Sequence, residues 1–110
     1  MIYLASPYSS DDPAVKQYRH DRAAEFVADF FNINCFIFSP IVYCHTLSLT
    51  NNLDGTFETW QRFNFHMLTQ CMSLWVLQLE GWDTSKGVTQ EISWAKELNR
   101  SILYFPENTV

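Results

Sequence analysis

Short apolar runs alternate with helical stretches along this chain, and this alternation limits the possible folds more than any other feature. The apolar runs cover residues 1–5, 35–38, 74–77 and 102–105. Between them, apolar residues recur at spacings of three and four, which is typical of amphipathic helices. Buried strands that alternate with helices predict a parallel sheet covered on both faces.

The helix boundaries follow from capping residues. Asp12 followed by Pro13 predicts a helix over residues 13–31, and Ser85 predicts the start of a last helix that runs to about Asn99. Thr56 or Thr59 is expected to open the helix between these two. Residues 41–56 show no clear periodicity, so we predict a loop there, and a loop of this length in a small domain is usually functional.

The predicted order is β-α-β-loop-α-β-α-β, within a single domain over residues 1–110. Right-handed crossovers then give an α/β, flavodoxin-like (Rossmann-like), doubly wound parallel sheet of four to five strands in three layers. Ligands of such sheets bind beyond the carboxyl ends of the strands. In this chain those ends lie at residues 6–8, 39–40 and 82–85.

Composition excludes several classes of protein. The formal net charge is −5 and no cluster of Lys or Arg is present, so no nucleic acid duplex is expected as a partner. No apolar stretch approaches the ~18 residues of a membrane span, and residues 1–10 do not resemble a signal peptide. We therefore expect a cytoplasmic protein with no membrane partner, in the host cytoplasm if a phage encodes it.

Neither a metal site nor a cofactor is predicted. Cys35, Cys44 and Cys71 are widely spaced without a CxxC motif, which is typical of structural thiols in a reducing compartment. No His, Cys or Asp spacing resembles a metal site, and no GxGxxG or Walker A motif is present.

Glu91 breaks the apolar stripe of the last predicted helix. A carboxylate facing a core is costly unless it is paired, protonated or exposed to a cavity. One alternative is a pair with Lys86 or Lys96 at the helix edge. The other is a ligand site, because Ser85 and Gly87 lie at the start of the same helix, where unpaired amides and the helix dipole favour an anion.

Asn64 breaks the stripe of the preceding helix. A buried amide bonded to backbone is the structural alternative to a role at a site. His45 follows the second strand, where a packing histidine is the alternative to a functional one, and His20 and His66 are interpreted as structural or exposed.

Four segments together resemble a known superfamily. They are IYLASPYS at the start, FSPI with His45 soon after, WQR at Trp60–Arg62, and WDTSKGVTQE at Trp82–Glu91. The chain resembles a branch of small bacterial and phage proteins in the nucleoside deoxyribosyltransferase-like superfamily, over residues 1–105. Nucleoside 2-deoxyribosyltransferases and 2'-deoxynucleoside 5'-phosphate N-hydrolases belong to this superfamily.

The resemblance implies a glycosidase site. Glu91 stands four residues after a glycine, as the catalytic glutamate does in the family, and the resemblance implies that Glu91 attacks the anomeric carbon of the sugar. Ser85 resembles the serine with which the 5'-phosphate hydrolases hold phosphate, whereas the transferases usually carry Asp there. The resemblance also implies substrate binding by Ser6, Pro7, Tyr8, Arg19, His45, Trp82, Asp83 and Gly87. It further implies a homodimer or higher homo-oligomer.

The chain departs from the family pattern at two positions. Asn64 stands where the family usually carries a ligand-binding aspartate, and an amide cannot donate an acidic proton to the leaving base. Met72 stands where the family commonly carries a second aspartate, and Asp83 in the adjacent loop is the candidate to compensate for it.

Three functions are compatible with this reasoning. The first is cleavage or exchange at the N-glycosidic bond of (deoxy)nucleoside 5'-monophosphates, with Glu91 as the nucleophile, Asn64 and Tyr8 orienting the substrate, and Trp60 or Trp82 stacking on the base. The second is binding of a nucleotide or NAD-derived ligand without turnover, as a sponge or sensor, which Asn64 favours. The third is an oligomerising module without a ligand, against which Glu91 beside Ser85 and Gly87 argues.

Overall fold

A computed structural model describes residues 1–51 and 57–109 of the chain. In this part of the chain, four parallel strands form one sheet in the order β2-β1-β3-β4. The strands are β1 (Ile2–Ala5), β2 (Ile37–Phe38), β3 (Ser73–Gln78) and β4 (Ser101–Pro106). The α/β, flavodoxin-like doubly wound fold predicted from the sequence is therefore confirmed, with four strands in the described residues.

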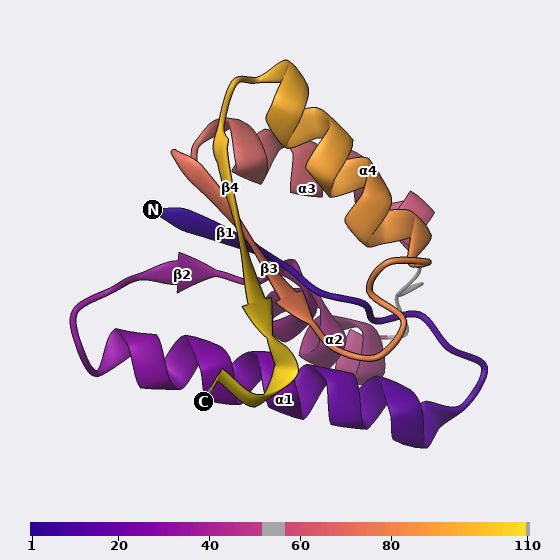
Figure 1. The fold of residues 1–110 in the computed structure, drawn as a ribbon. Helices are drawn as coiled ribbons and strands as arrows, with labels where there is room; N and C mark the ends of the chain where they lie inside the picture. Colours follow the sequence, from indigo (N-terminus) through magenta and orange to yellow (C-terminus); the bar gives the residue numbers. More distant parts are fainter. Residues whose placement is uncertain (52–56, 110) are drawn as a thin grey trace.

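Helices cover both faces of the sheet (Figure 1). The first two helices of the chain lie on one face of the sheet, and the third and fourth helices lie on the other face. The helices are α1 (Pro13–Phe31), α2 (Pro40–Asn51), α3 (Phe57–Thr69) and α4 (Lys86–Glu97), and a short 3-10 helix, η1 (Glu107–Thr109), follows β4. Each face therefore buries its own apolar cluster, as expected for a parallel sheet.

Two separate clusters form the core. On the α3 and α4 face, Tyr3 and Val76 of the sheet pack with Leu68 and Val88 of the helices. On the α1 face, Leu4 and Leu77 pack with Phe26. Successive residues of one strand point to opposite faces, and therefore Tyr3 and Leu4 belong to different clusters.

Local sequence explains where α1 and α4 begin. The Asp12 carboxylate accepts a hydrogen bond from Ala14 N at 2.9 Å, and Pro13 occupies the first turn. The Ser85 hydroxyl accepts a hydrogen bond from Val88 N at 3.2 Å. Both predicted caps are therefore confirmed.

The prediction of a loop over residues 41–56 is wrong for its first part, because α2 extends to Asn51. Ser39 Oγ accepts a hydrogen bond from Val42 N at 3.2 Å, so Ser39 and Pro40 start a helix as well as ending a strand. The helix is rich in β-branched residues and hydroxyls, whose helix propensity is low, and its packing against the α1 layer overrides that propensity. The predicted turn at Asp54-Gly55 and the predicted cap at Thr56 lie outside the described residues.

The order of the strands places a crevice between β1 and β3. The chain goes from β1 outward to β2 on one side, and then returns to β3 on the other side of β1. Loops that follow adjacent strands therefore leave the sheet in opposite directions at this point, which is the usual ligand position in doubly wound sheets.

Candidate functional site

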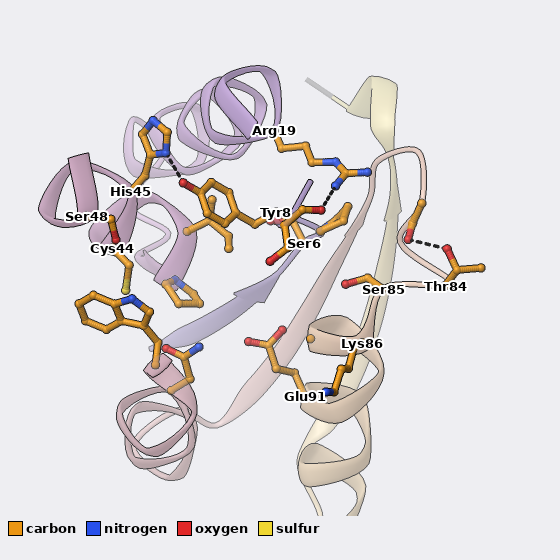
Figure 2. Close-up of a pocket in the computed structure, with 18 residues that line it drawn as sticks. Ser6, Tyr8, Arg19, Cys44, His45, Ser48, Thr84, Ser85, Lys86 and Glu91 are labelled. Carbon is orange, nitrogen blue, oxygen red and sulfur yellow. Dashed lines mark hydrogen bonds between the residues drawn. The ribbon is translucent and has the colours of Figure 1, made fainter. Parts of the chain in front are cut away.

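A cavity of about 350 Å³ opens at this crevice. Its lining comes from residues 6–9 after β1, from Gly81 and residues 84–87 after β3, and from the facing sides of α2 and α3 (Figure 2). The size lies within the range of small-molecule sites.

The structure places most of the predicted site residues in this cavity. Those that line it are Ser6, Pro7, Tyr8, Arg19, His45, Asn64, Ser85, Gly87 and Glu91. Trp82 and Asp83 are not among the lining residues. The Trp82 ring packs against Tyr104 with the centroids 5.7 Å apart, and Asp83 is exposed. Of the two tryptophans expected to stack on a base, Trp60, on α3, does line the cavity.

Glu91 is the most buried charged group of the site, with 4% of its surface exposed. The Tyr3 hydroxyl donates a hydrogen bond of 2.5 Å to Glu91 Oε2. Lys86 and Lys96, the partners considered above, are both exposed. A hydrogen bond from the sheet therefore holds Glu91, and its carboxyl group is directed into the cavity (Figure 2). Glu91 does not form a surface ion pair with Lys86 or Lys96.

Burial decides the protonation state of Glu91. Desolvation raises the pKa of the carboxyl from 4.5 to about 8, and the hydrogen bond from Tyr3 lowers it by a smaller amount. Burial also raises the pKa of the Tyr3 hydroxyl, which therefore keeps its proton. At neutral pH the carboxyl is mostly protonated, with an ionised fraction of roughly one tenth.

One end of the cavity is suited to an anion. The Gly87 amide lies in the first turn of α4, where backbone N–H groups have no acceptor within the helix, and the helix dipole is positive there. The Ser85 oxygen accepts the capping bond, so its own proton remains for a ligand. Ser6 Oγ, across the crevice, is buried and has no hydrogen-bond partner in the described part of the chain.

Arg19 adds a positive charge to that end. Its Nη1 donates to Ser9 O at 2.9 Å and its Nη2 to Glu80 O at 3.1 Å, which fixes the guanidinium between the loops after β1 and β3. Both acceptors are neutral carbonyls, and within residues 1–51 and 57–109 no carboxylate forms an ion pair with Arg19. The charge therefore remains available to a ligand; that Arg19 binds a substrate stays a prediction from the family resemblance.

His45 lies behind Tyr8 and is neutral. His45 Nε2 is 3.2 Å from Gln17 Oε1, an acceptor, so Nε2 carries the proton and Nδ1 accepts the Tyr8 hydroxyl at 2.6 Å. Burial, and next the neighbouring His20 ring stacked at 4.4 Å, lower the pKa of His45. His45 thus orients Tyr8. His20 has this structural contact, and His66 is exposed.

Apart from His45, sequence reasoning missed the lining that α2 supplies beyond Pro40, because residues 41–56 were assigned to a loop. Ile41, Cys44 and Ser48 belong to this group. Burial raises the pKa of the Cys44 thiol to about 11, so it acts as a neutral, weakly polar surface. Tyr3 was also missed, since it looked like a core residue; the available signal was that a buried tyrosine hydroxyl requires a partner.

The polar groups that line the cavity include few acids. Among the described lining residues Glu91 supplies the only carboxyl group. Asn64 Oδ1 and Ser48 Oγ are buried without a hydrogen-bond partner there. No group of three or more His, Cys, Asp or Glu side chains in the described residues is arranged to hold a metal ion. The arrangement is one of a single carboxyl among mostly neutral hydrogen-bonding groups, with the Arg19 guanidinium at the anion end.

These features define a class: a flavodoxin-like α/β protein with a cavity at the switch point of its sheet and a buried glutamate inside that cavity. The chain belongs to the family described as a domain of unknown function, DUF1937, whose model matches residues 1–107. No curated protein matches the chain. In the described residues, no helix is long and apolar enough to cross a membrane.

Proposed function

We propose that this protein cleaves or exchanges the N-glycosidic bond of (deoxy)nucleoside 5'-monophosphates, with Glu91 as the nucleophile. Membership of the nucleoside deoxyribosyltransferase-like superfamily, which the sequence motifs suggest, is part of this proposal. The observation that carries it is the position of the Glu91 carboxyl, buried in a cavity whose one end is suited to an anion. In a bound nucleotide, the phosphate would occupy the anion end and the sugar would lie beside the Glu91 carboxyl. The base would lie beyond the sugar.

The reaction uses the groups of the cavity as follows. The ionised Glu91 carboxylate attacks C1' of the sugar, and the bond between C1' and the base nitrogen breaks with its electron pair passing to the base. The base takes up a proton. Water then attacks C1' and breaks its bond to the Glu91 oxygen, and the proton that the water loses balances the one taken up by the leaving base. When a second base attacks C1' instead, that base loses the proton, and the Glu91 carboxylate is restored in both cases. The two acceptors give hydrolysis and transfer respectively.

The phosphate is assigned to the start of α4. Ser85, the Gly87 amide and Ser6 supply hydrogen-bond donors, and Arg19 supplies the charge. Tyr8, whose hydroxyl is fixed by His45, lines the same cavity and orients the sugar. A nucleoside without phosphate leaves Ser85, Ser6 and the Gly87 amide without the acceptor that a phosphate provides, so the proposal favours nucleotides.

A second candidate function is nucleotide binding without turnover. It is favoured by the absence of a second acid among the described lining residues: Asn64 cannot donate an acidic proton to a leaving base, and Glu91 is mostly protonated at neutral pH. A cavity that binds the phosphate but cannot protonate the leaving base would hold its ligand without cleaving it. Such a protein would sequester or sense a nucleotide or NAD-derived ligand, as a sponge or sensor.

Release of free base distinguishes these candidates. Wild type, Glu91→Gln and the matched control Glu97→Gln, which changes an exposed glutamate of the same helix, are incubated with a panel of ribo- and deoxyribonucleoside 5'-monophosphates and analysed by chromatography. We expect release by wild type and by Glu97→Gln, and a loss of at least 100-fold in Glu91→Gln because the nucleophile is removed.

The contrary outcome is equally clear. Nucleotide binding measured by calorimetry, together with no base release from any nucleotide, rejects the glycosidase and supports the binding protein. The oligomeric state and the cytoplasmic location stay predictions from the sequence, and size-exclusion chromatography with light scattering tests the dimer.

A further inference from the structure

The hydroxyl of Ser48 is an unused hydrogen-bonding group inside the cavity. A serine within a helix usually donates to the carbonyl four residues earlier, which here belongs to Cys44. Ser48 Oγ is buried and makes no hydrogen bond to the described residues. Buried polar atoms are nearly always paired, so an unpaired one that lines a cavity indicates a ligand that completes it.

The position of Ser48 determines which part of a ligand it meets. Ser48 and Cys44 lie on the α2 side of the cavity, while Ser85 and Arg19 lie on the other side (Figure 2). Glu91 lies between these two sides in the same view. A nucleotide with its phosphate at Ser85 and its C1' over Glu91 must therefore extend its base toward α2.

The α2 side has the composition of a base site. The neutral Cys44 thiol, Ile41 and the Trp60 ring supply weakly polar or apolar surface for the faces of a planar base. Among the described side chains of α2 and α3, Ser48 Oγ and Asn64 Oδ1 are the buried polar atoms without a hydrogen-bond partner. Apolar surface with a few unpaired polar groups is the usual way in which a pocket fixes the orientation of a ligand.

We propose that Ser48 recognises the edge of the base and contributes to the base preference of the site. This assignment rests on the proposed function, because it uses the same cavity and the same orientation of the nucleotide. Ser48 acts in binding only: its hydroxyl donates to, or accepts from, a polar atom of the base, and takes no part in the bond cleavage at Glu91.

Binding of two ligands tests this proposal without requiring turnover. Wild type, Ser48→Ala and the control Ser93→Ala, an exposed serine within α4, are titrated by calorimetry with nucleoside 5'-monophosphates and with ribose 5-phosphate, which has no base. Loss of one hydrogen bond to the base weakens nucleotide binding by roughly 5- to 10-fold. Ribose 5-phosphate binding by Ser48→Ala and all binding by Ser93→Ala remain unchanged.

Base preference gives a second measurement. We compare the affinities of wild type and Ser48→Ala for pairs of nucleotides that differ by an amino or a carbonyl group on the base. The pairs are adenosine and inosine 5'-monophosphate, and cytidine and uridine 5'-monophosphate. We expect the ratio of affinities within at least one pair to move toward one. The larger side chain of a Ser48→Leu variant fills the α2 side of the cavity. We expect this variant to bind ribose 5-phosphate as wild type does and to lose nucleotide binding.

The outcomes separate this proposal from the proposed function. The role of Ser48 is overturned if Ser48→Ala weakens the binding of ribose 5-phosphate and of nucleotides equally, or weakens the binding of neither. Base release by wild type would still support the proposed function in that case. Selective weakening of nucleotides without base release supports Ser48 and rejects the glycosidase. If wild type binds no nucleotide, both proposals are wrong.

Discussion

Glu91 lies in surroundings that stabilise its protonated form, although a nucleophile must be ionised. The carboxyl is 4% exposed and its pKa is raised to about 8, mainly because it is buried. The opposing influence is the hydrogen bond from Tyr3, which favours the charged form. These two effects give predictions that can be tested on single residues.

The first prediction concerns stability against pH. The pKa of Glu91 is about 8 in the folded chain and near 4.5 when exposed, so its contribution to stability is full below pH 4.5 and is lost as the pH rises through 8. The total loss is on the order of 5 kcal/mol. Glu91→Gln does not titrate, so we expect this variant to unfold at higher denaturant concentration than wild type at pH 9.

Urea unfolding at pH values from 5 to 9 measures this difference. Wild type should lose stability across the range, and the curve for Glu91→Gln should be flatter. Glu97→Gln, which replaces an exposed carboxyl, serves as the control. Parallel pH dependence in wild type and Glu91→Gln contradicts the raised pKa.

The second prediction concerns the pH dependence of base release. With ionised Glu91 as the nucleophile, kcat/KM rises with pH and levels off above about 8. Tyr3→Phe removes the hydrogen bond that lowers the pKa of Glu91, so the midpoint of the profile should move to higher pH. A rate that instead falls as pH rises through 8 indicates that Glu91 acts as an acid, and excludes it as the nucleophile.

At the scale of elements, the loop between β3 and α4 connects the sheet to the anion end of the cavity. Gly81 in this loop has φ +90°, and a Cβ added there lies 2.9 Å from Arg19 Nη2. The position therefore combines a backbone conformation that suits glycine with a close approach of the guanidinium.

We predict that Gly81→Ala destabilises the fold by about 1–2 kcal/mol because of the positive φ. The same variant displaces Arg19 from Glu80 O, and so weakens nucleotide binding as well. Chemical denaturation and calorimetry measure the two effects. Arg19→Met, which leaves the loop sequence intact, should weaken binding too; unchanged nucleotide affinity in both variants contradicts the assignment of Arg19 to the phosphate.

The elements differ in how well the sequence predicted them. Apolar periodicity with Asp12 and Ser85 as caps was sufficient to predict α1 and α4, because capping residues and one buried stripe determine those helices locally. The helix α2 was missed because its local propensity is low and its contacts with the α1 layer, invisible in a linear pattern, stabilise it.

The candidate site shows the same limit. Residues next to strand ends and at the start of α4 were predictable, because the topology brings those positions to one edge of the sheet. Ser48 depended on the missed helix, and Tyr3 depended on a contact between distant segments. Trp82 was predicted to stack on a base because it is aromatic and near the site, but its ring packs on Tyr104 of the neighbouring strand.

At the scale of the whole molecule, the site is a product of the strand order. The first strand lies inside the sheet between β2 and β3, and both loops of the crevice follow from that placement. The helix layers on the two faces meet the cavity from opposite sides, α1 and α2 from one and α3 and α4 from the other. The net charge of −5 does not oppose anion binding, because the donors and Arg19 act locally.

The hydrogen bond from Tyr3 to Glu91 joins residues 88 positions apart in sequence. During synthesis, Tyr3 leaves the ribosome long before its partner, and the bond forms only after α4 docks on the sheet. Glu91 is ionised in the unfolded chain at pH 7 and mostly protonated in the folded one, so folding at this pH consumes close to one proton. A pH indicator in a rapid-mixing experiment can therefore time the closure of the site.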